Sequence, residues 1–277
     1  MINKTKCKKD GICAAECPRG IITQAEGRAF PQVTEADEAY CMACGHCVAV
    51  CPYGALSVNG VDIEDCPEIK RDLVLSWDQA EQFLRSRRSI RVFKDKPVDR
   101  ETLEQLIRTA SYAPTASNGQ NLQWTVIEGR DRLEPLSREA IKWMERIIEA
   151  HPNSPAADYF RPIVDRWSTG YDGVLRTAQT LVVPSASKEN ANGLVDLSIA
   201  LAYPELAALP LGVGTCWAGM LRGAMLATPK LVKSMGLPEG HTWYYPMMIG
   251  YPKFKYYRLP ERKAPVIHWK QGLAEPE

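Results

Sequence analysis

Cysteine is the residue type in this chain that points most directly to chemistry. The chain has nine cysteines, and seven of them fall within the first 51 residues. Its first residues, Met1–Lys4, show no apolar segment of the kind that a secretory signal carries. An odd number of cysteines without such a signal argues against a disulfide framework and favours metal ligation in a reducing compartment. We therefore expect thiolate–metal chemistry near the N-terminus and a cytoplasmic protein.

A repeat with an offset of 34 residues relates these cysteines to one another. Three cysteines, two glycines and a proline recur: Cys7 with Cys41, Cys13 with Cys47, Cys17 with Cys51, Gly11 with Gly45, Gly20 with Gly54, and Pro18 with Pro52. One ligand-like position differs, because Asp10 corresponds to Cys44. Because these cysteines, glycines and prolines all recur at one offset, the segment is predicted to be a duplicated unit.

The second copy has a spacing that suits an iron–sulfur cluster. Residues 41–52 read CMACGHCVAVCP, a C-x2-C-x2-C-x3-C-P pattern. Three thiolates on a tight loop can hold three corners of one cluster, while the cysteine before the proline is carried to the neighbouring cluster. Two crossed ligand sets follow: Cys41, Cys44, Cys47 and Cys17 for one 4Fe-4S cluster, and Cys7, Asp10, Cys13 and Cys51 for the other.

Residues 1–60 thus resemble two-cluster bacterial ferredoxins, from which Asp10 is the departure. A carboxylate is a harder ligand than a thiolate, so the cluster beside Asp10 could be labile, become 3Fe-4S, or keep water at its fourth corner. Asp10 could instead be an ordinary turn residue before Gly11. Zinc is the alternative for the cysteines as a whole, but a structural zinc site needs two cysteine pairs at a separation that this run of four does not supply.

The rest of the chain predicts a larger domain of mixed helices and strands. Ser76 and Gln79 form a capping-box signature for one helix, and Asp99 can cap a second, in which Leu103, Leu106, Ile107 and Ala110 repeat at helical spacing. We expect strands at 124–127, 181–183 and 244–249, an apolar helix at 195–209, and a helix from Pro229 to Gly236. An amphipathic helix with Ile141, Met144 and Ile148 is a candidate lid. The class is α+β, with domains at 1–60 and 77–277 joined by a linker at 61–76.

Four short patches in this larger domain combine basic, polar and glycine residues. They are residues 87–91 (RRSIR), 114–120 (PTASNGQ), 211–219 (LGVGTCWAG) and 258–263 (RLPERK). Alone, each is an ordinary solvated helix face, loop or turn. Together and in this order, they resemble the nitroreductase family of FMN flavoproteins over residues 80–270.

The resemblance implies an α+β sandwich with FMN at the interface of an intertwined homodimer. The first and fourth patches would hold the FMN phosphate, because guanidinium groups offer paired donors to phosphate oxygens. The second patch would come from the partner subunit, and small residues of the third would let the backbone approach the flavin N5 edge. The implied FMN-binding residues are Arg87, Arg88, Ser89, Arg91, Pro114, Thr115, Ser117, Asn118, Gln120, Gly214, Ala218, Gly219, Arg262 and Lys263.

The two resemblances together predict an iron–sulfur flavoprotein oxidoreductase. We expect electrons from an external donor, such as a ferredoxin or a reduced nicotinamide, to pass through two clusters to FMN, which reduces a nitroaromatic, a quinone or a similar flat electrophile. Because the flavin does the bond-making, no catalytic side chain is predicted. Two other functions stay open: reduction of an activated double bond or reductive dehalogenation on the same FMN, and a non-catalytic redox sensor.

Charge and hydropathy exclude other partners. The formal net charge is +1, and basic residues are spread along the chain, so we expect no nucleic-acid partner. The apolar stretch at 199–221 has the length of a membrane span but contains Pro204, Glu205 and Pro210. A buried helix followed by a glycine-rich loop explains this stretch better, so we expect no membrane segment.

Overall fold

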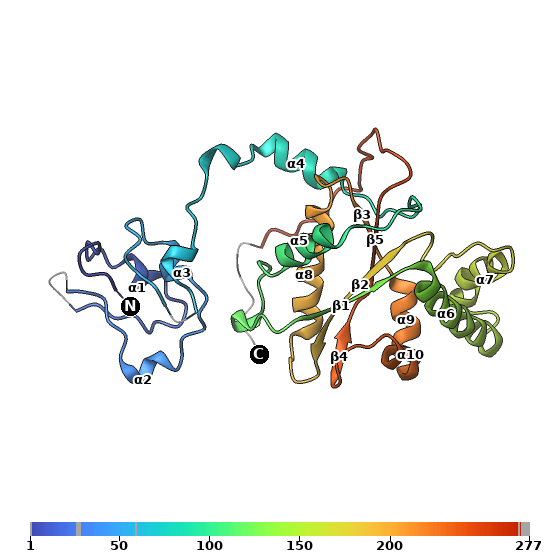
Figure 1. The fold of residues 1–277 in the computed structure, drawn as a ribbon, viewed down its shortest axis with the longest axis horizontal. Helices are drawn as coiled ribbons and strands as arrows, with labels where there is room; N and C mark the ends of the chain where they lie inside the picture. Colours follow the sequence, from blue (N-terminus) through green and yellow to red (C-terminus); the bar gives the residue numbers. More distant parts are fainter. Residues whose placement is uncertain (1, 26–28, 59, 271, 273–277) are drawn as a thin grey trace.

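Two separate parts make up the computed structural model, which describes residues 2–25, 29–58, 60–270 and 272. Figure 1 shows a small N-terminal part to one side of a larger part that is built on a β-sheet. The segment between them contains two short 3-10 turns, η1 (Ile63–Asp65) and η2 (Arg71–Leu73), and leads into helix α4 (Trp77–Ser86). All residues from 67 to 79 are exposed, so this connection packs on neither part.

The N-terminal part shows the sequence repeat in its backbone. Its helices are α1 (Ile12–Glu16), α2 (Glu35–Glu38) and α3 (His46–Ala49). Helices α1 and α3, which pack on each other, each begin after a left-handed glycine, Gly11 with φ 79° and Gly45 with φ 73°. Glycine takes this conformation without the steric cost that a side chain adds. The same tight turn therefore lies beside the cysteine loop in both copies.

A five-stranded antiparallel sheet forms the centre of the larger part. Its strands are β1 (Gln123–Glu128), β2 (Thr180–Ser187), β3 (Gly214–Trp217), β4 (His241–Tyr244) and β5 (Met247–Gly250). The order is β1-β2-β5-β3, and β4 pairs with the far end of β2. Strand β2 is buried along nearly its whole length, as a central strand with covered faces must be.

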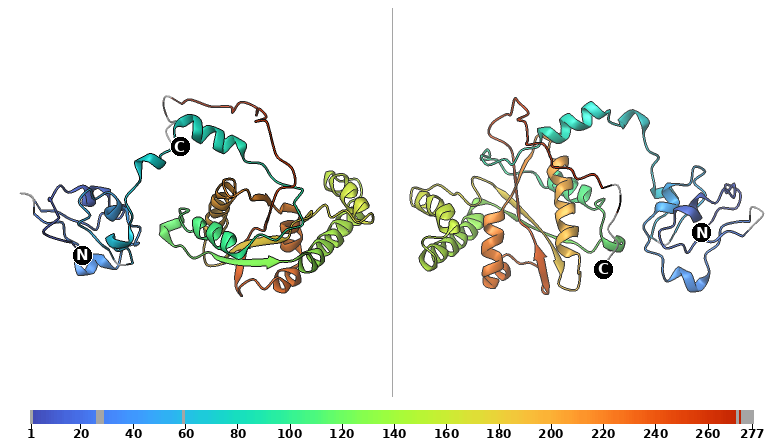
Figure 2. Two further views of the ribbon diagram at one scale, coloured as in Figure 1. Left: turned by 45° about the horizontal axis from the view of Figure 1, so that its top comes forward. Right: turned by 180° about the vertical axis from the view of Figure 1, so that it is seen from behind.

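Side chains along each strand point alternately to the two faces of the sheet, so the apolar core is divided into two layers. Leu181, Val183 and Met248 pack on one face of the sheet, while Val182 and Met247 pack on the other. Successive strand residues point to opposite faces, so both faces need a helical cover. The first face is covered by α6 (Arg130–Ala150), α7 (Pro155–Trp167), α9 (Gly219–Ala227) and α10 (Pro229–Ser234), and the second by α5 (Arg100–Ala110) and α8 (Gly193–Ala207). The result is the predicted α+β class, with a helical layer on each side of the sheet (Figure 2).

Local signals at the helix starts are confirmed. Ser76 and Gln79 form a reciprocal capping box at α4, with hydrogen bonds of 2.9 and 3.3 Å. Asp99 caps α5 by accepting a hydrogen bond from the Thr102 amide at 2.8 Å. Each cap satisfies an amide that has no partner within its helix.

The strand expected at 244–249 is wrong, because two strands occupy this region. Strand β4 ends at Tyr244 and β5 begins at Met247, with Pro246 between them. Proline has no amide hydrogen to donate to a sheet, so pairing stops there. The carbonyl oxygen of Pro246 instead accepts a hydrogen bond from the Ala218 amide at 2.9 Å.

The helix proposed as a lid is also corrected by the structure. Ile141 and Met144 lie on α6 with 2% and 0% of their surface exposed, and they pack in the core with residues of α9 such as Leu221 and Met225. The apolar face of α6 is therefore part of the core. No described helix is both long and apolar enough to cross a bilayer.

Replacing Met144 with Ala should destabilise the larger part by about 2–5 kcal/mol, because the cavity left at a fully buried site loses packing as well as transfer free energy. All seven tryptophans lie at or after Trp77, so their fluorescence during denaturant unfolding reports on the larger part. The control is Glu145→Ala at the adjacent exposed position, which should change the free energy of unfolding by less than about 0.5 kcal/mol. Equal effects of the two substitutions would contradict this description of α6.

Candidate redox sites

The N-terminal thiols fall into two groups that mix the two copies of the repeat. Burial raises the pKa of the Cys13 thiol, and the charges of Cys51 and Cys7 raise it further. Burial likewise raises the pKa of the Cys47 thiol to about 11, with contributions from the charges of Cys44 and Cys17. Each group thus combines two cysteines of one copy with the last cysteine of the other. Neither group includes Cys41, and the crossed ligand sets stay a prediction.

Cys17, which is partly exposed, differs from Cys13 and Cys47 in its surroundings. Burial raises the pKa of this thiol, but backbone amides outweigh burial, and the pKa is lowered. The amides belong to Ile21, Arg19, Ile22 and Gly20. Amides directed at a sulfur favour its thiolate form, which is the form that binds iron.

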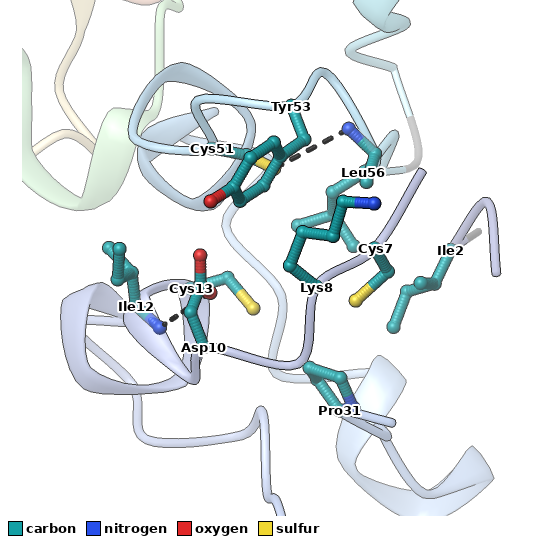
Figure 3. A pocket seen from close by; sticks show the side chains of 11 residues that line it. Ile2, Cys7, Lys8, Asp10, Ile12, Cys13, Pro31, Cys51, Tyr53 and Leu56 are labelled. Atoms are coloured by element: carbon teal, nitrogen blue, oxygen red, sulfur yellow. Dashed lines mark hydrogen bonds between the residues drawn. The ribbon is translucent and has the colours of Figure 1, made fainter. Parts of the chain in front are cut away.

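Cys7, Asp10, Cys13 and Cys51 surround one small cavity, shown in Figure 3. Its other walls are mainly apolar and include Ile2, Ile12, Pro31 and Leu56. The Asp10 carboxylate lies beside Cys13 and accepts a hydrogen bond from the Ile12 amide at 3.3 Å. Three thiols and one carboxylate around an apolar cavity fit an iron–sulfur cluster with one oxygen ligand. The alternative, that Asp10 is an ordinary turn residue, also fits, because its carboxylate accepts this hydrogen bond within its own turn.

A single metal ion fits these residues less well. Within the described ranges, no group of three or more Cys, His, Asp or Glu side chains is arranged to hold one ion. A structural zinc ion draws its four ligands to within about 2.3 Å of one point. Ligands of a four-iron cluster stand farther apart, because each binds a different iron. The arrangement therefore favours clusters over zinc.

In the larger part, the first and third patches meet around a buried acid. The Glu205 carboxylate is only 11% exposed, and it accepts hydrogen bonds from Arg87 at 3.0 Å and from the Trp217 indole at 3.1 Å. Arg87 also donates to Ser89 at 3.4 Å, and the Ile90 amide bonds to the Thr215 carbonyl at 2.8 Å. Glu205 was not among the predicted site residues, although it is one of only two acids in the otherwise apolar helix α8, together with Asp196.

A cavity of about 470 Å³ lies next to this network. Its lining includes Arg88, Glu205, Gly214 and Thr215, together with Lys94, Lys253 and Lys255. Four cations and one acid leave it positive, which suits a ligand that carries a phosphate. Arg88 is held there by hydrogen bonds to the carbonyls of Arg85 and Arg87, at 3.0 and 2.9 Å. The cavity therefore fits the phosphate end of FMN.

The glycine-rich third patch is shaped mainly by packing. A Cβ atom on Gly214 would lie 2.4 Å from Ile90, so this position must be glycine for β3 to lie against the first patch. Ala218 and Gly219 begin α9, and the Ala218 amide already donates to Pro246. The structure thus explains the glycine at 214 by the close approach of the chain to itself, while the approach of a flavin to Ala218 and Gly219 stays a prediction.

The second patch stands apart from the first and third. Thr115 accepts a hydrogen bond from the Gln120 amide at 3.0 Å, and the Ala116 amide donates to the buried Asp196 of α8 at 3.0 Å. Its Asn118 side chain contacts the N-terminal part. Among the described residues, the hydrogen bonds of this loop lead to α8 and to the N-terminal part. They do not lead to the other patches.

The fourth patch and Arg91 lie at the surface. Residues 253–270 form an exposed arm without regular structure, on which Glu261 pairs with Arg85 of α4 at 2.6 Å. Arg262 and Lys263 are exposed beside this pair. Arg91 is exposed and donates to the Ser89 carbonyl at 3.3 Å. The structure brings Arg87, Arg88, Ser89 and Gly214 together, and leaves Arg262 and Lys263 on the arm.

The fold and these sites define a flavin-dependent oxidoreductase with a ferredoxin-like domain at its N-terminus. The nitroreductase family model matches residues 84–251, and a 4Fe-4S dicluster domain matches residues 5–55. The chain therefore belongs to the nitroreductase family, and its larger domain is an FMN-dependent oxidoreductase domain of nitroreductase type.

Individual relatives agree with this assignment. A protein from Archaeoglobus fulgidus named as an NADH dehydrogenase/NAD(P)H nitroreductase is 29% identical over 66% of this chain and 92% of its own length. An FMN reductase [NAD(P)H] from Bacillus subtilis is 28% identical over 57% of this chain and 64% of its own length. The crystal structure of a Bacteroides fragilis nitroreductase with bound FMN has the same fold, with a TM-score of 0.57 and 22% identity over 70% of this chain and 99% of the other.

Cys47→Ala should lower the iron and acid-labile sulfide content of anaerobically purified protein by about half, because it removes a ligand of one of two clusters. The matched control is Cys66→Ser, which removes a cysteine outside both groups and should leave the counts unchanged. Unchanged iron in Cys47→Ala would contradict the crossed ligand sets.

Arg88→Ala should weaken FMN binding about ten- to hundredfold, since a hydrogen bond to a charged group contributes about 1.5–3 kcal/mol. Fluorescence titration of flavin-free protein with FMN measures the dissociation constant. Arg100→Ala serves as the control, because Arg100 is 87% exposed on α5, where it pairs only with Glu104. An unchanged affinity in Arg88→Ala would rule out this cavity as the phosphate site.

Proposed function

We propose that this protein carries electrons from an external low-potential donor through two 4Fe-4S clusters to FMN, which reduces a nitroaromatic, a quinone or a similar flat electrophile. When bound, the clusters supply one-electron transfer and the flavin supplies two-electron chemistry. The observation that carries the proposal is the presence, in one chain, of two crossed thiol groups and a nitroreductase fold.

The protein's own residues hold and shape these groups. The two thiol groups, with Cys41 and Asp10 as their fourth members, bind the clusters, and the cluster beside Asp10 is the more labile or takes the 3Fe-4S form. Arg88 and the lysines of the neighbouring cavity bind the FMN phosphate, and Arg87 is oriented by Glu205. Arg262 and Lys263 complete the phosphate site when the arm folds over it. No side chain acts as acid or base.

A homodimer completes the flavin site in this proposal. Large apolar side chains are exposed on the helices that have an uncovered face, including Trp77 and Leu84 of α4, which are 77% and 56% exposed, and Val195 of α8 at 57%. Apolar surface of this extent indicates an interface. A partner subunit that covers α4 and α8 would bury it and would bring the second patch toward a flavin. The free state of the cysteines suits a cytoplasmic location.

The relay is tested by activity with two different donors. With reduced ferredoxin as donor and a nitroaromatic as acceptor, a Cys13→Ala/Cys47→Ala variant should lose nearly all turnover, because a ligand of each cluster in the relay is removed. With dithionite, which reduces flavin directly, the same variant should keep wild-type turnover, which shows that the FMN site is intact. Full activity with ferredoxin in this variant would refute the relay.

A further inference from the structure

One side chain joins the two domains through hydrogen bonds. The Asn118 amide nitrogen donates to the carbonyl oxygens of Met42 and Ala43, at 3.0 and 3.1 Å. Met42 and Ala43 are the two residues between Cys41 and Cys44, so they form the tip of the second cysteine loop. An amide NH2 group has two hydrogens, and both acceptors here can only accept, so the geometry uses the full donor capacity of Asn118.

Asn118 is held in place for this contact from its own side. Its amide oxygen accepts a hydrogen bond from the Gln120 side chain at 3.0 Å. The loop is anchored to α8 by the bond between the Ala116 amide and Asp196, a residue that is only 3% exposed. The contact is therefore made by a fixed group on the larger domain.

Backbone strain is concentrated at the same contact. Six described residues other than glycine have positive φ, and four of them lie here: Ala43, Ser117, Asn118 and Gln120. Their φ values lie between 47° and 54°, a region that non-glycine residues enter at a free-energy cost. Strain of this kind persists where surrounding contacts hold it, and it gathers at sites with a function.

We propose that Asn118 docks the second cysteine loop onto the larger domain, and that the cluster held by Cys41, Cys44, Cys47 and Cys17 is the one from which electrons leave for the flavin. This inference rests on the proposed relay. Docking brings the residues between Cys41 and Cys44 against the second patch, whereas the cavity with Asp10 belongs to the other cluster. The Asp10 cluster is then the entry point for electrons.

The electron count is simple. Each transfer moves one electron from the docked cluster to the flavin, and the external donor replaces it through the Asp10 cluster. Two transfers, with protons from water, complete the two-electron reduction of the flavin. Asn118 takes no part in bond-making, so it is a positioning residue.

Asn118→Asp tests the contact, because a carboxylate in place of the amide would face two carbonyl oxygens that it cannot bond. We expect the holoprotein to keep its iron and sulfide content but to expand in small-angle X-ray scattering, as the N-terminal domain leaves the larger domain. Flavin reduction by reduced ferredoxin in a stopped-flow instrument should slow about tenfold, as two hydrogen bonds are lost. Asn118→Ala removes the donor without adding charge and should act in the same direction.

The matched control is Asn121→Asp in the same loop. The Asn121 side-chain oxygen accepts a hydrogen bond from Asn190 at 3.2 Å, which a carboxylate can still accept. This variant should match the wild type in both scattering and rate. Cys44→Ala gives the rate at which reduced ferredoxin reduces the flavin without the docked cluster.

The outcomes separate the two proposals. If Cys44→Ala reduces its flavin as fast as the wild type, the relay itself fails. If Cys44→Ala is slow but both Asn118 variants scatter and react like the wild type, the relay stands and the docking role of Asn118 is wrong. Loss of FMN in both Asn118 variants, with unchanged scattering, would also overturn it, since Asn118 would then serve the flavin alone.

Discussion

The N-terminal domain has only a small apolar core, so the proposed metal–thiolate bonds are the constraint on which its fold depends. Its fully buried cluster consists of Ile22, Cys47, Val48 and Leu56, and a core of this size is too small to balance the conformational entropy of some sixty residues. One of the four, Cys47, is itself a proposed cluster ligand. Burial that raises the pKa of the Cys47 thiol to about 11 disfavours a free thiolate there, so bound iron both supplies the missing stabilisation and holds the sulfur in its charged form. With the proposed ligands, folding and cluster binding in this domain would be one event.

In the larger domain, by contrast, the apolar core supplies the stability. Its candidate site lies on a scaffold that does not need a bound cofactor to fold. Strand β2 sends alternate side chains to two helical layers, so the sheet is fixed from both faces. On this frame, Glu205 holds Arg87 and Trp217 in one network although its partners are 118 and 12 residues away. Breaking such a partly buried pair by removing one partner costs more than the pair contributes, because the remaining charge is left without a partner. The network therefore fixes the geometry of the first patch more than it adds to stability.

Sequence reasoning succeeded where a signal is local and failed where it is not. The capping box at Ser76 and the Asp99 cap each join residues three positions apart, and the cysteines repeat at one fixed offset of 34 residues, so pattern was enough in these cases. The division of residues 244–249 into two strands depended on Pro246, a breaker that was present in the sequence but outweighed by its apolar neighbours. The Arg87–Glu205 pair and the contact of Asn118 with Met42 join residues 76 to 118 positions apart. No periodicity or spacing encodes such contacts, because they arise only when whole elements pack.

The covalent connection explains how so small an interface can serve two domains. Two hydrogen bonds between separate proteins would give negligible affinity, since association costs translational and rotational freedom that they cannot offset. Residues 61–76 remove most of that cost, because a tether of this length holds the N-terminal domain at an effective concentration of about millimolar or more. The docked state of the two domains can then be well populated although the contact contributes little free energy, and the domains can still separate quickly. The fusion of the two domains in one chain is therefore what makes a single asparagine sufficient to set their register.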